Sequence, residues 1–194
     1  MKRLRIEHAT GFEYPGDVTA SYNEARMLPG TTESQFVLSA TLDIEPAASV
    51  NTYVDYFGTK VTSFDLLSPH SELRLVARSL VEVRPRPFEH SDISWERLAV
   101  EASRTIETVE QLGQTTRTQP HPEVAEIARS IASRHENPGA AAHDIAMAIG
   151  DAVQYVQGVT GVHSTAHESW EARKGVCQDM AHITIGALRS VGIP

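Results

Sequence analysis

Apolar residues in the first part of the chain recur at every second position, which is typical of antiparallel strands that bury one face. The clearest run places small and apolar residues on one face: Leu73, Leu75, Ala77, Ser79, Val81 and Val83. A second run alternates from Phe36 to Ile44 and ends at Pro46, and shorter candidates span residues 4–8, 18–25, 52–57 and 61–67. Turn signals separate these runs at residues 14–17, 28–30 and 57–59. Six or seven short strands of this kind predict a β-sandwich or barrel-like module.

The period changes after residues 84–87, whose sequence is Arg-Pro-Arg-Pro. Proline cannot donate a hydrogen bond to a sheet ladder, so two prolines here favour a boundary. We therefore predict an N-terminal antiparallel β-domain over residues 1–87 and a mostly helical domain over residues 88–194. The fold class is α+β.

Helical spacing dominates the second domain, and it predicts four helices. The first carries Trp95, Leu98, Ala99, Ala102, Ile106 and Val109, and a polar stretch over 114–121 follows it. The second begins at Pro122, carries Val124, Ile127, Ala128 and Ile131, and ends at residues 137–139. The third carries Ile145, Ala148, Ile149, Ala152, Val153 and Val156. The fourth begins near Cys177 and continues through Ala181, Ile185 and Leu188 to Gly192.

Composition and charge argue against a membrane-spanning protein and against a nucleic-acid-binding protein. The 194 residues are 41% hydrophobic and 22% charged, and no apolar run approaches the roughly 18 residues of a membrane-spanning helix. Lys and Arg number 17 against 25 Asp and Glu, a net charge of −8, which argues against a nucleic-acid partner. Residues 1–8 carry charge without an apolar stretch behind it, so we expect a cytoplasmic protein rather than a secreted one.

Cys177 is the single cysteine and the centre of the chemical argument. Gly175 marks a break in the chain just before the fourth predicted helix, so Cys177 should lie in the first turn of that helix. There the free backbone N–H groups and the positive end of the helix dipole stabilise a thiolate. The same N–H groups can hold the oxyanion formed when a thiolate attacks a carbonyl. A structural interpretation stays open, because Cys177 shares a helical stripe with Ala181, Ile185 and Leu188 and free cysteines are often buried.

A nucleophilic cysteine also needs a histidine that accepts its proton. His182 lies about 140° around the helix from Cys177, and His163 and His167 fall in a loop-like stretch from which they could approach only by folding back.

A metal site is a second interpretation of the same region, because His163 and His167 are four residues apart and Glu168, Glu171 and Cys177 follow. The glycines among residues 158–161 make a helix here improbable, and the spacing matches no standard ligand set. No acidic cluster has the spacing of a calcium loop. We expect no metal and no cofactor.

Several segments resemble the bacterial transglutaminase-like superfamily. They are GVTGVHSTA at 158–166, GVCQDMAH at 175–182 and LRSVGIP at 188–194. In the first domain, YNEARMLP at 22–29, DYFG at 55–58 and PHSEL at 69–73 resemble the β-domain that precedes the core in this group. Thr59 departs from the family pattern, which often has asparagine there.

The resemblance implies a papain-like thiol mechanism in which Cys177 is the nucleophile and forms a thioester. The expected substrate is a peptide or protein with a glutamine or other amide group, and the expected reaction is hydrolysis or transamidation. In the family the general-base histidine and its aspartate come from strands after this helix. We therefore expect a core truncated before its C-terminal sheet and a chain with little activity of its own.

Two other hypotheses remain. The β-domain could be a binding module attached to a degenerate, non-catalytic core, or the motif could be a chance match around a buried cysteine. The apolar face of the last helix also needs cover, which a homodimer, the β-domain or neighbouring helices would supply; left exposed, it would make the chain poorly soluble.

Overall fold

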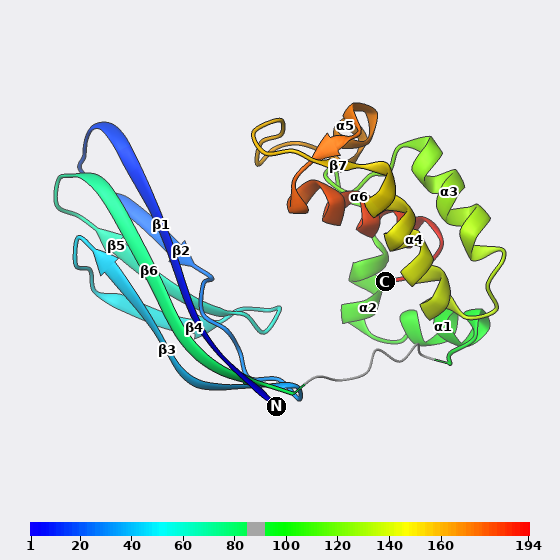
Figure 1. Cartoon of the computed structure of the whole chain (residues 1–194), viewed down its shortest axis with the longest axis horizontal. Coiled ribbons are helices and arrows are strands. Elements are labelled where there is room, and N and C mark those ends of the chain that lie inside the picture. Colours follow the sequence, from blue (N-terminus) through cyan, green and yellow to red (C-terminus); the bar gives the residue numbers. More distant parts are fainter. Residues whose placement is uncertain (85–91) are drawn as a thin grey trace. The chain divides into compact units, whose positions relative to one another are not determined.

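The computed structural model describes residues 1–84 and 92–194. The chain divides into two compact units, Met1–Phe88 and Glu89–Pro194 (Figure 1). The domain boundary predicted between Pro87 and Phe88 lies outside the described residues. The two units are described separately below.

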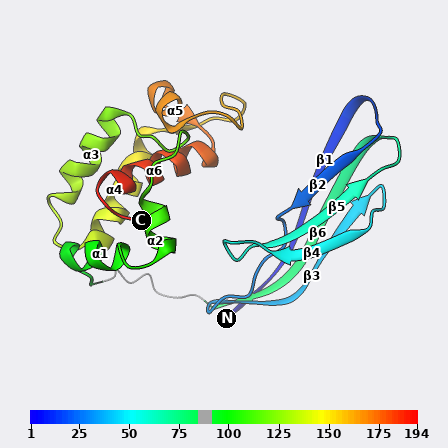
Figure 2. The same ribbon diagram turned by 180° about the vertical axis from the view of Figure 1, so that it is seen from behind.

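The N-terminal unit consists of two three-stranded antiparallel sheets. The first has the order β1-β6-β3 and is built from β1 (Lys2–Val18), β6 (His70–Val83) and β3 (Gln35–Glu45). The second has the order β2-β5-β4 and is built from β2 (Ser21–Ala25), β5 (Lys60–Leu66) and β4 (Val50–Val54). Figure 2 shows both sheets from behind.

Apolar side chains from the two sheets meet in one core, as the alternating pattern predicts. The buried members are Ala25, Phe64, Leu66, Leu73 and Leu75. Further along β6, Ala77, Ser79 and Val81 are also buried, so the predicted inner face of this strand is confirmed. The sandwich-like architecture follows from these contacts.

Two predictions in this unit are wrong in detail because of strand irregularities. The predicted turn at residues 14–17 lies inside β1, where the pairing register with β6 shifts between Glu13 and Val18. β1 is an edge strand, so it tolerates Pro15 at this bulge. A second register shift between Val37 and Ser39 in β3 breaks the alternation, and Phe36 and Leu38 remain 59% and 42% exposed.

The C-terminal unit contains six helices and one pair of two-residue parallel strands within its described residues. The helices are α1 (Trp95–Ala102), α2 (Ile106–Leu112), α3 (Pro122–Ala132), α4 (Pro138–Ala152), α5 (Ala166–Ala172) and α6 (Cys177–Ser190). The strands are β7 (Gln154–Tyr155) and β8 (Lys174–Gly175). The core is formed by Val124, Ala128, Ile131, Ile145, Ile149, Val153, Ala166, Trp170, Ile183 and Ala187.

Helix boundaries differ from the prediction where polar side chains cap the backbone. The single helix predicted over residues 95–109 is two helices, because the Thr105 side chain accepts a hydrogen bond from the Thr108 N–H and starts α2. Residues 137–139 do not end a helix but begin one: Asn137 caps α4 and accepts from the Ala140 N–H. The predicted start of α3 at Pro122 and the course of α6 from Cys177 to the turn at Gly192 are confirmed.

The stretch predicted as loop-like around His167 contains helix α5. Its start is a capping box, in which Thr165 accepts from the Glu168 N–H and Glu168 accepts from the Thr165 N–H. Gly158 and Gly161 lie before this helix and therefore do not weaken it. None of the helices among the described residues combines the length and the apolar character needed to cross a membrane.

Gly186 allows α6 to pack closely on the loop before α3. A Cβ added at Gly186 would lie 2.0 Å from the Thr118 carbonyl oxygen, which belongs to the backbone. We expect Gly186→Ala to destabilise the chain by about 1–3 kcal/mol in urea unfolding, because the backbones must separate. The matched control is Gly150→Ala in α4, where nothing lies within 4 Å; we expect it to stabilise by about 0.5–1 kcal/mol. Equal losses in both variants would contradict this packing.

Candidate active site

Cys177 is the first residue of α6 and its side chain is exposed. The buried residues of this helix are Asp179, Ile183, Gly186 and Ala187. The stripe predicted through Cys177, Ala181 and Ile185 is therefore not the buried face, since Ala181 and Ile185 are also exposed. The hypothesis of an inert thiol in the core is wrong for this structure.

The short strand β8 leads directly into the helix that begins with Cys177. The Val156 N–H donates to the Gly175 carbonyl oxygen at 2.8 Å, and the Gln154 N–H donates to the Arg173 carbonyl oxygen at 2.9 Å. A Cβ added at Gly175 would lie 2.6 Å from the Cβ of Asp179. Glycine is thus required for the close approach of this strand to the first turn of α6.

Asp179 is the hydrogen-bonding centre of the site and is only 1% exposed. Its Oδ2 accepts from the Thr160 hydroxyl at 2.6 Å and from the Val176 N–H at 2.7 Å, and its Oδ1 accepts from the Ser169 hydroxyl at 2.9 Å. Burial raises the pKa of Asp179, but these hydrogen bonds and the nearby His182 outweigh it and hold that pKa below its ordinary value. The carboxylate therefore joins three segments: the 156–164 loop, α5 and the start of α6.

The start of α6 leaves backbone donors beside the thiol. The N–H groups of Asp179 and Met180 donate to the Val176 carbonyl oxygen. Within the described part of the chain, the N–H groups of Cys177 and Gln178 are then the first-turn donors left for a ligand. An oxyanion formed on a carbonyl attacked by the Cys177 thiolate would be stabilised here.

The 156–164 loop is held against the first turn of α6. Besides Thr160, the Gly161 carbonyl oxygen accepts from Gln178 Nε2 at 3.4 Å. Arg117 anchors the far side of the loop through hydrogen bonds to the Val162 carbonyl oxygen and to His163 Nδ1. These hydrogen bonds hold the loop in place beside the residues that follow Cys177.

The candidate histidines are not brought to the thiol. His163 contacts Arg117, and His167 lies on α5, where its ring is 4.7 Å from that of His121. His182 lies on α6, and its buried Nδ1 has no hydrogen-bond partner in residues 1–84 and 92–194. No histidine in these ranges hydrogen-bonds the Cys177 sulfur. The residues that the structure describes thus place an exposed thiol at the start of α6 without a histidine hydrogen-bonded to it.

Sequence reasoning missed the roles of Asp179, Thr160 and Ser169, which form this network. The one local signal was an acidic residue three positions after the helix N-cap: Asp179 accepts from the Val176 N–H, although valine has no side-chain acceptor to complete a capping box. The two hydroxyl partners come from 10 and 19 residues upstream and have no local signature. The alternative metal group that combines His163 with His167, which the sequence did not favour, is not found among the described residues.

Thr160→Val tests the attachment of the loop, because valine keeps the shape of threonine without the hydroxyl. Loss of a hydrogen bond to the buried carboxylate of Asp179 should cost about 1.5–3 kcal/mol in urea unfolding and speed proteolysis within residues 156–164. The control Val162→Thr changes an exposed side chain and should stay within about 0.5 kcal/mol. A Thr160→Val chain as stable and as protease-resistant as the parent would show that the loop is held by other contacts.

Two family descriptions match the chain. Residues 4–82 match the bacterial transglutaminase-like N-terminal region, and residues 125–194 match the transglutaminase-like superfamily. An uncharacterized protein of Mycobacterium leprae is 38% identical over 195 residues, which cover 100% of this chain and 69% of that protein. An uncharacterized protein of Mycobacterium tuberculosis is 29% identical and is matched over 98% of this chain and 63% of its own length. The chain thus spans about two thirds of these relatives.

A solved structure shares the fold. The "Putative Cysteine Protease" from Cytophaga hutchinsonii superposes with a TM-score of 0.75 at 18% identity, covering 99% of this chain and 64% of that chain. The architecture is that of an α+β protein with antiparallel sheets followed by helices. The family matches and the Mycobacterium leprae relative show that the chain belongs to the transglutaminase-like superfamily.

Proposed function

We propose that Cys177 is the nucleophile of a thiol enzyme that cleaves or transfers acyl groups from amide or peptide bonds. The observation that carries the proposal is the exposed thiol at the first residue of α6, beside free backbone N–H groups. A helix start of this kind favours negative charge on both the attacking sulfur and the oxyanion. Family membership supports the same chemistry.

The proposed reaction has two steps. The Cys177 thiolate attacks the carbonyl carbon, the carbonyl oxygen becomes an oxyanion, and the C–N bond then breaks to leave a thioester on Sγ. The departing amine takes a proton from a general acid. Water or a second amine attacks the thioester, and the thiolate is released with an acid or a new amide.

The presence or absence of a general acid determines which substrates residues 1–194 can use. An amine leaves only with a proton, and within the described residues no histidine contacts the sulfur to supply it. An activated ester has a stable anionic leaving group and needs no such proton. We therefore propose that residues 1–194 are acylated by activated esters, and that amide cleavage requires a histidine and an aspartate of the kind that the family resemblance implies.

The test is a burst experiment with p-nitrophenyl acetate. We expect one p-nitrophenolate released per chain, one acetyl group on Cys177 by peptide mass spectrometry, and slow deacylation. A glutamine-containing peptide should remain intact under the same conditions. An acetyl group found on lysines or histidines, with Cys177 free, would contradict the proposal.

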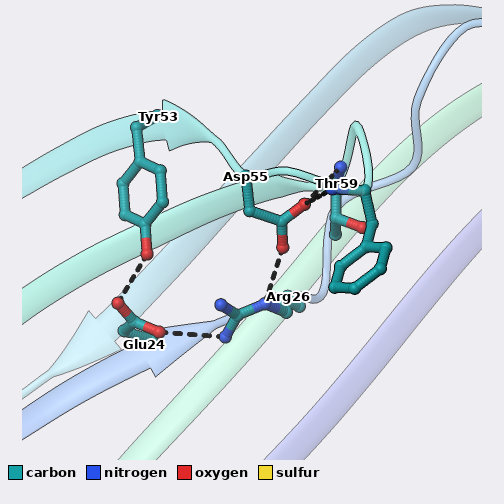
Figure 3. A network of polar contacts seen from close by, with 6 residues as sticks. Glu24, Arg26, Tyr53, Asp55 and Thr59 are labelled. Atoms are coloured by element: carbon teal, nitrogen blue, oxygen red, sulfur yellow. Dashed lines mark hydrogen bonds and ion pairs between the residues drawn. The ribbon is translucent and has the colours of Figure 1, made fainter. Parts of the chain in front are cut away.

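A binding role is the second candidate, and a polar network on the N-terminal unit favours it. Glu24 accepts from the Tyr53 hydroxyl at 2.6 Å and from Arg26 at 3.0 Å, and Arg26 donates to Asp55 at 3.2 Å (Figure 3). The hydrogen bond from Tyr53, followed by that from Arg26, lowers the pKa of Glu24, so this carboxylate is ionised at neutral pH.

The turn beside this network is suited to contact a partner. The Asp55 carboxylate accepts from the Phe57 and Thr59 N–H groups and fixes the turn. Tyr56 and Phe57 are both exposed on it, and exposed aromatics are common in binding surfaces. The rate of the burst separates the candidates, because a binding module with a degenerate core should acylate Cys177 no faster in the native chain than in the urea-unfolded chain.

A further inference from the structure

Three potential metal ligands from distant parts of the sequence meet on the surface of the C-terminal unit. His121, His167 and Glu171 each offer a ligand atom, and these atoms lie within 4.8 Å of one another. The His167 Nε2 is 3.5 Å from a carboxylate oxygen of Glu171, which lies one helical turn further along α5. Among residues 1–84 and 92–194, this is the one group of three such side chains.

The backbone positions of these ligands are fixed by buried contacts. His121 is the N-cap of α3, and His167 and Glu171 lie on α5. The two helices are joined by Trp170, which is 1% exposed and donates from Nε1 to Glu123 at 2.9 Å. The distance between the backbones that carry the ligands is therefore set by the fold and not by the exposed side chains.

The charge around the group suits a cation. Glu123 is paired with Arg173 at 2.6 Å, and this guanidinium also stacks on the Trp170 ring at 3.7 Å. Because Glu123 is already paired with Arg173, Glu171 is the carboxylate that supplies negative charge beside the His121 and His167 rings. Its partner in this structure is the His167 ring, which is a metal ligand only when neutral.

We propose that His121, His167 and Glu171 bind a divalent transition-metal ion of the Zn²⁺ class, independently of the proposed acyl transfer. Two imidazole nitrogens and one carboxylate oxygen form a donor set that zinc uses, with water as the fourth ligand. Tetrahedral bonds to zinc place ligand atoms about 3.4 Å apart. The side chains of His167 and Glu171 are 46% and 61% exposed, so they are free to rotate over the short distance required.

Metal binding at His121 would break the hydrogen bond by which His121 caps α3, and this loss can be measured. The Nδ1 of His121 accepts the Glu123 N–H at 3.1 Å and caps α3. Coordination through Nδ1 displaces this hydrogen bond, and coordination through Nε2 requires the proton on Nδ1, which then cannot accept. Either way the Glu123 N–H loses its partner when the metal binds.

The experiment titrates Zn²⁺ alone into the Cys177→Ser chain, which lacks the competing thiolate. We expect saturable 1:1 binding by calorimetry and a changed amide signal of Glu123 in NMR spectra. His167→Gln and Glu171→Gln should each weaken binding at least about tenfold, since losing a ligand costs no less than losing an outer-shell partner. His121→Asn removes the imidazole but retains a good N-cap, so it should weaken binding equally without unfolding α3.

His163→Asn is the matched control, because His163 lies outside the group and should leave Zn²⁺ affinity unchanged. The proposal is overturned if the three ligand variants bind Zn²⁺ as tightly as the Cys177→Ser chain, or if the Glu123 amide signal does not respond. It is also overturned if His163→Asn weakens binding as much as His167→Gln. A circular dichroism spectrum equal to that of the parent is required of every variant compared.

Discussion

Cys177→Ser is expected to abolish the p-nitrophenol burst, with a loss of at least about 10³-fold in acylation rate. A serine hydroxyl is not ionised at neutral pH, and its activation requires a base that contacts it. No such base lies at the start of α6 among the described residues. The thiol, by contrast, has an appreciable thiolate fraction without assistance, and the helix start favours it.

The fold should not change in this variant. Cys177 is exposed, so the free energy of unfolding should stay within about 0.5 kcal/mol of the parent value. Urea unfolding followed by circular dichroism checks this. An unchanged burst in Cys177→Ser would assign the acylation to another side chain and contradict the proposed function.

Asp179→Ala is expected to destabilise the chain by about 3–5 kcal/mol. The change leaves the Thr160 and Ser169 hydroxyls and the Val176 N–H without their shared acceptor, around a side chain that is itself 1% exposed. The 156–164 loop and α5 should both lose protection from hydrogen exchange. Urea unfolding gives the free energy, and exchange measured by mass spectrometry gives the location.

Asp179→Asn is the matched variant, because it keeps the shape and removes the charge. Its amide oxygen can accept from Thr160 and Val176, and its NH₂ can donate to the Ser169 hydroxyl, which reverses its role. We expect a loss of only about 1–2 kcal/mol. Equal losses for alanine and asparagine would show that the charge, and not the geometry, stabilises the site.

The lowered pKa of Asp179 sets the pH dependence of this contribution. A carboxyl group with a folded-state pKa below its unfolded value of about 3.9 stabilises the fold fully above that pH. The contribution is lost as the pH falls through the lower, folded-state pKa. The difference in stability between the parent and Asp179→Asn should therefore be constant from pH 5 to pH 8 and shrink below about pH 4.

Local patterns in the sequence predicted much of the fold. Alternation identified β6 and its inner face, and the proline at the first position identified the start of α3. The errors arose where a polar side chain caps the backbone, as Thr105 and Asn137 do, or where a bulge shifts the register of a strand. These features depend on geometry that hydrophobic periodicity does not contain.

The candidate site was predicted only in part for a related reason. Gly175 and the following residues placed Cys177 at a helix start, and the structure agrees. The buried stripe of α6 was assigned to the wrong face, because it contains a glycine and an aspartate that do not count as apolar. The partners of Asp179, and the meeting of His121 with His167 across 46 residues, are products of tertiary packing.

The rate at which iodoacetamide alkylates the native chain tests the central claim most directly, because Cys177 is the single thiol. If Cys177 lies exposed at the start of α6, the native chain should be labelled completely in one phase, within about tenfold of the rate in the urea-unfolded chain. Native labelling slower than this by several orders of magnitude, with reaction only on unfolding, would show a buried structural cysteine and contradict the proposed active site.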